Sequence, residues 1–440
     1  MNKELTIVGA GLAGSEAALQ LAKRGWNVRL IEMRPLRQTP AHQTGRAAEL
    51  VCSNSLKSTR LDTGSGMLKA ELKLLGCELL AIAEKARVPA AHALAVDRTL
   101  FSQYVEEQLA SHTNITRITQ EVTDLPAGNC LIAAGPLASD ALIASLRKLI
   151  GEEHLYFFDA IAPIVDTQSL DLDKVFAKAR YDKGDADYLN CPFDKEQYEA
   201  FVDALLEGEQ FEAHEFENEF FAGIDFSYYE NCTPIEELAR RGRDTLRHGV
   251  MRPMGLEDPH TGKKPYAVLQ LRAENKDFTA YNIVGAQTML RQAEQKRIFR
   301  LIPGLENASF LRYGSIHRNA YLDAPKVLNP DLSLKNRSDV WIAGQLAGWE
   351  GYVESIAGGL FAALIIDKSL PALPEESMTG QLLRRLTRNT DRRFQPINAN
   401  FGLLPALKNA PRDKRLKRQM LADRGVAALE AVVGDSLLLS

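Results

Sequence analysis

The chain has 440 residues, of which 45% are hydrophobic and 25% are charged, and its formal net charge is −4. This length allows two or three domains, and the composition is that of an ordinary globular protein. No apolar run reaches the ~18 residues that a membrane helix needs, and the first ten residues do not resemble a signal or transit peptide. We therefore expect a cytoplasmic protein without membrane association. Any contact with nucleic acid must rely on local basic patches.

The N-terminal segment carries the strongest motif of the chain. An apolar strand is predicted over residues 5–8, a helix over 15–24 and a second strand over 27–31. Between the first strand and the helix lies a GxGxxG motif with Gly9, Ala10, Gly11 and Gly14, and the second strand ends at Glu32. This order is typical of a dinucleotide-binding unit.

Each residue type in this motif has a physical role. Gly9 would make the tight turn, Gly11 would let the backbone approach a pyrophosphate, and Gly14 would let the helix pack on the strand. The free N–H groups at the helix N-terminus suit phosphates, and Glu32 suits ribose hydroxyls. We therefore expect a bound dinucleotide.

Two later strands favour FAD over NAD as this dinucleotide. One apolar stretch ends at Gly135, and another ends at Gly344 and Gln345, before a helix of small residues over about 353–366. Both resemble the later motifs of flavoproteins with two dinucleotide folds, although many of those have Asp where Gln345 stands. The alternative is that both are ordinary sheet strands.

These elements predict an α/β fold with a discontinuous, Rossmann-like FAD-binding domain and an inserted α+β domain. We expect the FAD-binding domain to comprise residues 1–166 and 314–440, with a basic C-terminal segment. Residues 167–313 would form the insertion domain, for substrate or RNA.

Two segments are candidates for RNA contact. In the insertion, Arg240, Arg241 and Arg243 begin a run of five arginines, which could equally pair with the acidic run at 199–219. In the tail, residues 381–418 carry eleven Lys or Arg residues and two Asp residues. The tail candidates are Arg384, Arg385, Arg392, Arg393 and Arg415. A loop over 394–402 with aromatic ends adds a surface on which bases could stack.

The five cysteines are scattered, without a CxxC pair or zinc spacing, so we expect neither disulfides nor a metal site. Cys77, Cys130 and Cys191 are interpreted as packing residues. Cys52 and Cys232 lie in segments that carry a family resemblance.

Over nearly its whole length the chain resembles the folate/FAD-dependent tRNA (uracil-5-)-methyltransferases, the TrmFO family. The related GidA/MnmG flavoproteins look similar in the flavin-binding frame but are longer. The segments that carry the resemblance are Ile7–Ala18, Glu49–Leu56, Ala93–Arg98, Asn231–Glu236, Gly314–Asn319, Ala343–Gln345 and Glu350–Ser355.

The resemblance implies an enzyme that methylates carbon 5 of a uridine in the T-loop of tRNA without S-adenosylmethionine. Methylenetetrahydrofolate would donate the carbon, FAD would carry it and NAD(P)H would act as reductant. No obligatory protein partner is expected. Carbon 5 of uracil is a poor nucleophile, and adding a thiolate to carbon 6 activates it.

The family uses two cysteines, which match Cys232 and Cys52. We assign Cys232 as the nucleophile and place Cys52 near the flavin, although these roles could be exchanged. Tyr352 and Trp349 are candidates to stack on the flavin or folate ring. His317, Glu350 and Glu354 are candidates for the general base.

Several alternatives stay open. The same chemistry could act on ribosomal RNA, or the protein could carry out another FAD-dependent tRNA modification of the MnmG type. A flavin-sensing RNA-binding protein without catalysis would not depend on Cys232. A disulfide reductase is disfavoured, because Cys52 has no cysteine partner within five residues. The preferred nicotinamide and the oligomeric state are not predicted.

Overall fold

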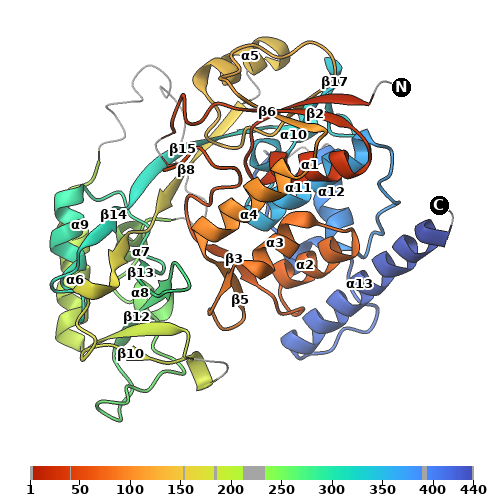
Figure 1. Ribbon diagram of the computed structural model, residues 1–440. Coiled ribbons are helices and arrows are strands. Elements are labelled where there is room, and N and C mark those ends of the chain that lie inside the picture. Colours follow the sequence, from red (N-terminus) through yellow and green to blue (C-terminus); the bar gives the residue numbers. More distant parts are fainter. Residues whose placement is uncertain are drawn as a thin grey trace.

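The computed structural model describes residues 3–39, 41–151, 154–182, 186–211, 233–388 and 394–438. They form two lobes joined by a long two-stranded ribbon (Figure 1). One lobe holds the N-terminal dinucleotide unit and the C-terminal part of the chain. The other holds the middle of the chain. This arrangement confirms the expected α/β class with an inserted α+β domain.

The first lobe is built on a six-stranded sheet in the order β16-β17-β7-β1-β2-β6. Its strands are β1 (Glu4–Val8), β2 (Asn27–Glu32), β6 (Ile115–Thr119), β7 (Cys130–Ile132), β16 (Ser333–Leu334) and β17 (Arg337–Ile342). All neighbouring pairs are parallel except the edge pair of β16 and β17.

The strand register brings the predicted motifs to one edge of this sheet. Val8 is aligned with Ile31 and Ile132, and Ile132 is aligned with Ile342. Each of these residues ends or nearly ends its strand. The glycine turn, Glu32 and the two later glycine motifs therefore follow at the same carboxyl edge, where open α/β sheets bind ligands.

Helices cover this sheet. α1 (Leu12–Lys23) packs closely on α11 (Tyr352–Ile366). A Cβ atom at Gly359 would lie only 2.1 Å from the carbonyl oxygen of Ala13, so the approach of the two helices requires glycine there. The other helices of this lobe are α2 (Gly64–Leu74), α3 (Glu78–Lys85), α4 (Arg98–Ala110), α5 (Asp140–Ile150), α10 (Ala324–Val327), α12 (Met378–Thr387) and α13 (Lys414–Leu438). A small sheet joins β3 (Ser55–Ser58), β5 (Ala93–Val96) and β4 (Arg87–Val88). Short 3-10 turns occur at η5 (Gly344–Ala347) and η6 (Phe401–Leu403).

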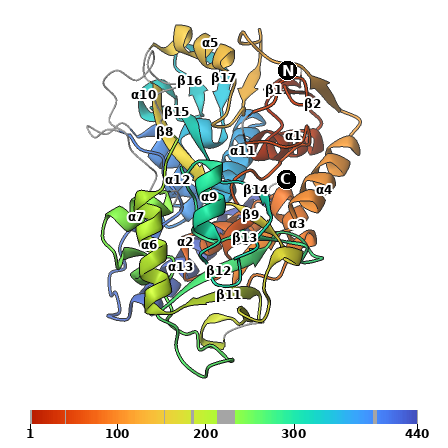
Figure 2. The same ribbon diagram turned by 90° about the vertical axis from the view of Figure 1, so that its left-hand side faces the viewer.

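The second lobe has its own antiparallel sheet, in the order β10-β11-β12-β13-β9-β14, and its own apolar core. The strands are β9 (Ile164–Asp166), β10 (Phe176–Ala177), β11 (Tyr188–Phe193), β12 (Ala267–Ala273), β13 (Ala280–Ile283) and β14 (Phe310–Arg312). Its helices are α6 (Lys195–Glu207), α7 (Ile235–Arg240), α8 (Thr245–His248) and α9 (Gln292–Phe299), with 3-10 turns η1 (Thr167–Ser169) and η2 (Arg180–Asp182). Figure 2 shows α6 and α9 on the outer side of this sheet.

The ribbon that joins the lobes consists of β8 (His154–Ile161) and β15 (Ser315–Leu322), which pair antiparallel. We propose the division of the chain at 166 and 314 that the sequence suggests. β9 pairs with β13 and β14, which are strands of the second lobe. This pairing would place the first boundary at the start of β9, Ile164, two residues before 166. Along the described part of the chain, no helix is both long and apolar enough to span a bilayer.

Candidate active site at the cofactor motifs and Cys52

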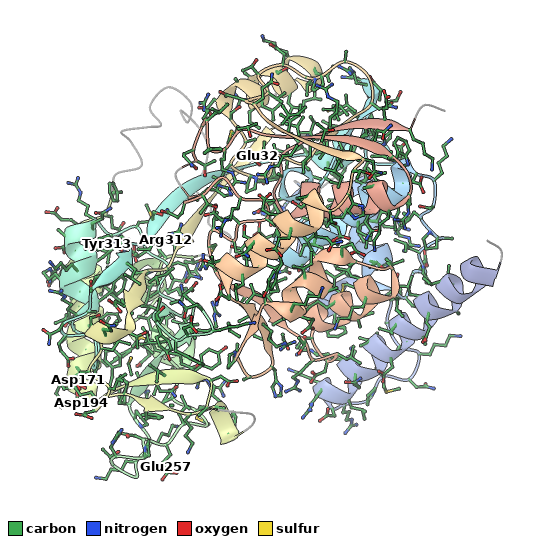
Figure 3. The ribbon with its side chains drawn as sticks, in the orientation of Figure 1. Glu32, Asp171, Asp194, Glu257, Arg312 and Tyr313 are labelled. Atoms are coloured by element: carbon green, nitrogen blue, oxygen red, sulfur yellow. The ribbon has the colours of Figure 1, made fainter. Side chains whose placement is uncertain are left out.

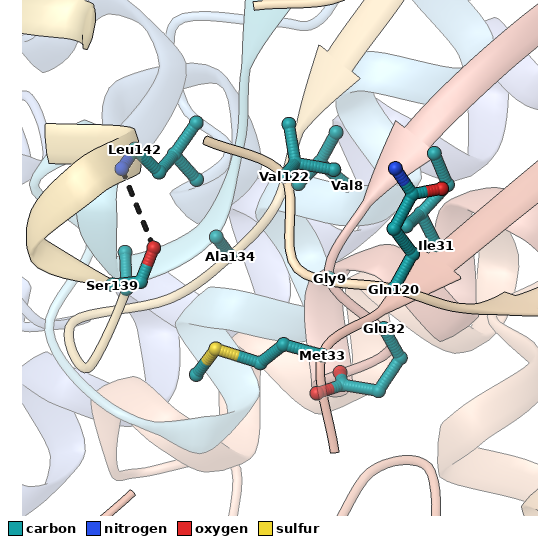
Figure 4. A pocket seen from close by; sticks show the side chains of 11 residues that line it. Val8, Gly9, Ile31, Glu32, Met33, Gln120, Val122, Ala134, Ser139 and Leu142 are labelled. Atoms are coloured by element: carbon teal, nitrogen blue, oxygen red, sulfur yellow. Dashed lines mark hydrogen bonds between the residues drawn. The ribbon is translucent and has the colours of Figure 1, made fainter. Parts of the chain in front are cut away.

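The glycine turn after β1 lines a pocket at the carboxyl edge of the sheet (Figure 4). Gly9 has a φ of +101°, and a Cβ atom at Gly14 would lie 1.8 Å from the carbonyl oxygen of Gly9. A Cβ atom at Gly11 would meet nothing within 4 Å. The turn therefore needs glycine at its first and third positions for its own geometry, while Gly11 opens onto free space beside the N-terminus of α1.

Glu32 lines the same pocket, next to the glycine turn. Its carboxylate accepts hydrogen bonds from the backbone N–H of Ala10 at 2.9 Å and from Nε of Arg34 at 2.9 Å. Burial alone would raise the pKa of Glu32, but the hydrogen bond and charge of Arg34 outweigh it and lower the pKa. The carboxylate is therefore ionised and fixed in position, as an acceptor for ribose hydroxyls must be.

The later motifs reach the same region from other strands. Gly135 follows β7 and Gly344 begins η5 directly after β17. Nε2 of Gln345 donates a hydrogen bond to Glu350 at 2.7 Å, and Glu350 is buried. The amide that stands where many flavoproteins have Asp is thus held by a neighbouring carboxylate.

Cys52 lies beside the start of α11. The backbone N–H groups of Cys52 and Ser53 donate hydrogen bonds to the hydroxyl oxygen of Tyr352, at 2.7 and 3.1 Å. Burial raises the pKa of Tyr352, so the hydroxyl stays protonated. Two segments 300 positions apart in the sequence are therefore joined, and Cys52, which is partly exposed, lies next to the predicted flavin motif.

The insertion domain holds the other side of the Cys52 segment. Arg98 pairs with Glu274 at 2.5 Å and donates to the carbonyl oxygen of Leu50 at 2.7 Å. Arg272 donates to the side chains of Ser53 and Asn54, both at 2.8 Å. No sequence motif marks Arg272 or Glu274, and only the folded chain brings them to Cys52.

A further cation, Arg312, closes this region at the end of β14, where the lobes meet (Figure 3). Its guanidinium donates to the carbonyl oxygen of Ala41 at 3.0 Å. Burial and the nearby charge of Arg98 lower the pKa of Arg312. The surroundings of Cys52 therefore hold three arginines from three different segments.

The second candidate cysteine, Cys232, lies outside the described residues. The described residues continue from Thr233, and Glu236 at the start of α7 is fully buried. Its carboxylate accepts hydrogen bonds from the N–H of Met289 at 2.6 Å and from the hydroxyl of Thr288. These bonds anchor the segment that follows Cys232 to the body of the insertion domain.

The remaining cysteines are buried packing residues, as expected. Cys130 lies in the sheet, and burial raises its pKa to about 12. Burial also raises the pKa of the thiols of Cys77 and Cys191.

The three arginine candidates in the insertion are exposed at the end of α7. Arg240 pairs with Glu237, and Arg243 pairs with Asp203 of α6 at 2.6 Å. Asp203 belongs to the acidic run, so the salt-bridge alternative holds for Arg243. Arg241 is exposed and follows Arg240 at the C-terminal end of α7.

The tail candidates differ in how free their side chains are. Arg384 donates to the carbonyl oxygens of Leu373 and Pro374, and Arg385 lies over the ring of Phe394 at 5.9 Å. Arg415 begins α13 and is 71% exposed, with Asp62 at 3.2 Å. Arg392 and Arg393 lie outside the described residues.

Two expectations about aromatic side chains are wrong. Phe394 is 1% exposed and packs against the turn at Gly348, so it offers no surface to a base. Trp349 is fully buried against Phe361 and cannot stack on a flavin or folate ring. Both side chains fill the core at the Gly344–Tyr352 segment, to which Trp349 itself belongs.

Of the base candidates, Glu354 is fully buried beneath the same segment. Its Oε1 accepts from the N–H of Ala399, and Lys57 lies 3.5 Å away. Burial also lowers the pKa of the neighbouring Lys69 to about 7. The side chain of His317 lies outside the description.

Comparison with known proteins adds to this geometry. Residues 4–373 match the family model of glucose inhibited division protein A. The chain is 48% identical to the methylenetetrahydrofolate–tRNA-(uracil-5-)-methyltransferase TrmFO of Listeria monocytogenes serotype 4b, over 99% of this chain and 100% of that protein. It is also 48% identical to the Bacillus subtilis protein of the same name, over 98% and 99% of the two chains. The chain belongs to the TrmFO family.

The fold of this TrmFO-family chain has a counterpart among solved structures. Aquifex aeolicus GidA superimposes with a TM-score of 0.68 over 98% of this chain and 73% of that one, at 15% identity. At this identity the likeness concerns the fold alone. The resemblance stated from the sequence motifs, to the TrmFO family with GidA as a relative, is thereby confirmed.

Proposed function

We propose that this protein methylates carbon 5 of a uridine in tRNA, with methylenetetrahydrofolate as carbon donor and FAD as cofactor. Membership of the TrmFO family supports this function. The observation that carries it is the junction of Cys52 with Tyr352, which sets a partly exposed thiol beside the segment that follows the predicted flavin motif.

The residues of the site fit FAD. The free space at Gly11 lies beside the N-terminus of α1, where a pyrophosphate would bind. The fixed carboxylate of Glu32 would hold the adenosine ribose. Gly344, Gln345 and the backbone up to Tyr352 would hold the flavin half, with Gly135 beside them. When bound, FAD supplies the redox chemistry that converts a folate-derived carbon unit into a methyl group.

The protein's own side chains would supply the remaining chemistry on the uracil ring. The thiolate of Cys232 would add to carbon 6 of uracil, which makes carbon 5 nucleophilic. Cys52 would act on the flavin side of the site, and Arg312 would place a positive charge near it, while the charge of Arg98 is balanced by Glu274. Carbon 5 would then form its bond to the folate-derived one-carbon unit. After that a base would remove the proton from carbon 5, and the thiolate would leave carbon 6 as the double bond reforms.

The finer parts of the function are also proposals. The target is the T-loop uridine, the reductant is NAD(P)H, and the enzyme works in the cytoplasm without an obligatory protein partner. Arg240, Arg241, Arg243, Arg384, Arg385, Arg392, Arg393 and Arg415 are proposed to contact RNA. Arg415 is 71% exposed, whereas Arg384 is engaged by backbone carbonyls.

The test is a methylation assay with purified protein, methylenetetrahydrofolate, NADPH and unmodified tRNA. Digested RNA is analysed for 5-methyluridine by mass spectrometry, with Cys52→Ala and Cys232→Ala in parallel and Cys191→Ala as the matched control. We expect product only in the presence of folate, from the wild type and the control. If 5-methyluridine forms only on ribosomal RNA, the substrate of the enzyme is ribosomal RNA instead of tRNA. A protein without flavin, or one that is inert on both RNAs, would refute the proposal.

A further inference from the structure

The Cys52 segment is bound by the insertion domain as well as by its own lobe. The contacts come from one short stretch, Arg272 to Glu274, at the end of β12. Nε of Arg272 donates to Oδ1 of Asn54 at 2.8 Å, and its Nη2 donates to Oγ of Ser53 at 2.8 Å. In return, Nδ2 of Asn54 donates to the carbonyl oxygen of Ala273 at 2.8 Å.

The same stretch also fixes the segment through Arg98. Glu274 accepts two hydrogen bonds from this guanidinium, at 2.5 and 3.2 Å. The remaining N–H groups of Arg98 reach the carbonyl oxygens of Leu50 and Cys52, at 2.7 and 3.4 Å. Arg98 thus connects the insertion domain directly to the backbone on both sides of residue 51.

These contacts are shielded from water. Asn54 is fully buried, while Arg272 and Glu274 are 8% and 6% exposed. Charge-assisted and bidentate hydrogen bonds shielded from water are stronger and more directional than those on a surface. The opposite side of the segment is held by the Tyr352 hydroxyl, so the Cys52 backbone lies between two anchors.

We propose that Arg272 and Glu274 of the insertion domain are positioning residues for Cys52. Their contacts described above are with Ser53, Asn54 and Arg98, and they act by holding the segment 50–54 against Tyr352. The inference rests on the proposed function for its catalytic consequence. It makes the geometry of the flavin-side cysteine depend on the docking of the domain that carries Cys232.

The first readout is independent of methylation. Full-length holoprotein is pulsed with iodoacetamide, and alkylation of Cys52 is followed by peptide mass spectrometry. Glu274→Gln keeps the size of the side chain and removes its charge, while Glu274→Asp keeps the charge. The control is Glu306→Gln, which breaks an exposed ion pair with Lys174 on the same domain.

We expect Glu274→Gln to increase the alkylation rate of Cys52 by about fivefold or more, because the insertion-domain anchor loses its charged pair with Arg98 and thereby its hold on the backbone at Leu50 and Cys52. Glu274→Asp should restore part of the protection, and Glu306→Gln should behave as the wild type. In the methylation assay, kcat of Glu274→Gln should fall about tenfold with KM for tRNA within about twofold, which is the signature of misplaced catalytic groups.

A change of less than twofold in the alkylation of Cys52 in Glu274→Gln would overturn the proposal, and so would an equal change in Glu306→Gln. If Glu274→Gln does not fold, Arg272→Gln removes the bonds to Ser53 and Asn54 and is judged by the same criteria. If the wild type makes no 5-methyluridine, the proposed function fails, while the alkylation result still decides the positioning role.

Discussion

At the scale of single residues, burial separates groups that the sequence shows as equivalent. Glu236 and Glu237 are neighbours at the start of α7, yet Glu236 is fully buried, whereas Glu237 is partly exposed and pairs with Arg240. Burial raises the pKa of Glu236 to about 7, in spite of its hydrogen bonds to Met289 and Thr288. The hydrogen bonds of this carboxylate hold the segment that follows Cys232, so we expect this attachment to depend on pH.

The sign of this sensitivity follows from linkage. A carboxyl group whose pKa is higher in the folded state stabilises the fold fully below its unfolded pKa, near 4.5, and loses that contribution as the pH rises through about 7. Glu236→Gln removes the titration. Between pH 4.5 and 8, the stability of the wild type should therefore fall by about 3 kcal/mol relative to Glu236→Gln.

This prediction is checked by urea unfolding across that pH range, with Glu237→Gln as control. The Glu237→Gln profile should run parallel to the wild type. Parallel profiles for the wild type and Glu236→Gln would contradict the assignment.

At the scale of elements, the turn between β1 and α1 separates structural from ligand-facing glycines. At Gly14 a methyl group would collide with the carbonyl oxygen of Gly9, whereas at Gly11 it would enter open space, and Gly11 already has a φ of −72°. The motif assigns the two glycines different roles, and of the two only Gly14 is required by the packing of helix on strand.

Gly14→Ala should therefore destabilise the flavin-free protein by about 3 kcal/mol or more, since overpacking forces the backbone to shift. Gly11→Ala should leave that stability within about 1 kcal/mol and should lose FAD, because the methyl group occupies the path of the pyrophosphate. Thermal unfolding of flavin-free protein and the flavin absorbance per chain measure the two effects. Equal flavin content in Gly11→Ala and the wild type would contradict the placement of FAD.

At the scale of the whole molecule, the charge of the chain is unevenly distributed. The net charge is −4, yet α13 begins with Lys414, Arg415, Lys417 and Arg418, all exposed. In Figure 1 this helix lies along the outer side of the first lobe, next to α2. We propose that this basic stretch of α13 meets RNA phosphates.

Removing two of these charges should weaken the salt dependence of tRNA binding. For Lys417→Ala/Arg418→Ala, the slope of log K against log salt concentration should become less steep by about 2, since each phosphate contact contributes about one unit. Filter binding at several salt concentrations measures the slope. Lys3→Ala, which removes an exposed lysine elsewhere, should leave it unchanged. An unchanged slope in the double variant would exclude α13 from the RNA interface.

The sequence by itself determined the β1-α1-β2 unit, the later glycine motifs and the family. These features are local, because hydrophobic periodicity, glycine spacing and a terminal acid act over a few residues. The strands observed at Glu4–Val8 and Asn27–Glu32, and the helix at Tyr352–Ile366, lie within a few residues of the predicted limits.

Only the tertiary structure decided which residues surround Cys52 and which aromatic side chains are available. The contacts of Cys52 with Tyr352, and of Asn54 with Arg272, join segments 300 and 218 positions apart. Trp349 and Phe394 could be assigned to the core only once α11, α12 and the tail were packed together. Side-chain burial depends on what the rest of the chain places against a residue, and no local pattern contains that information.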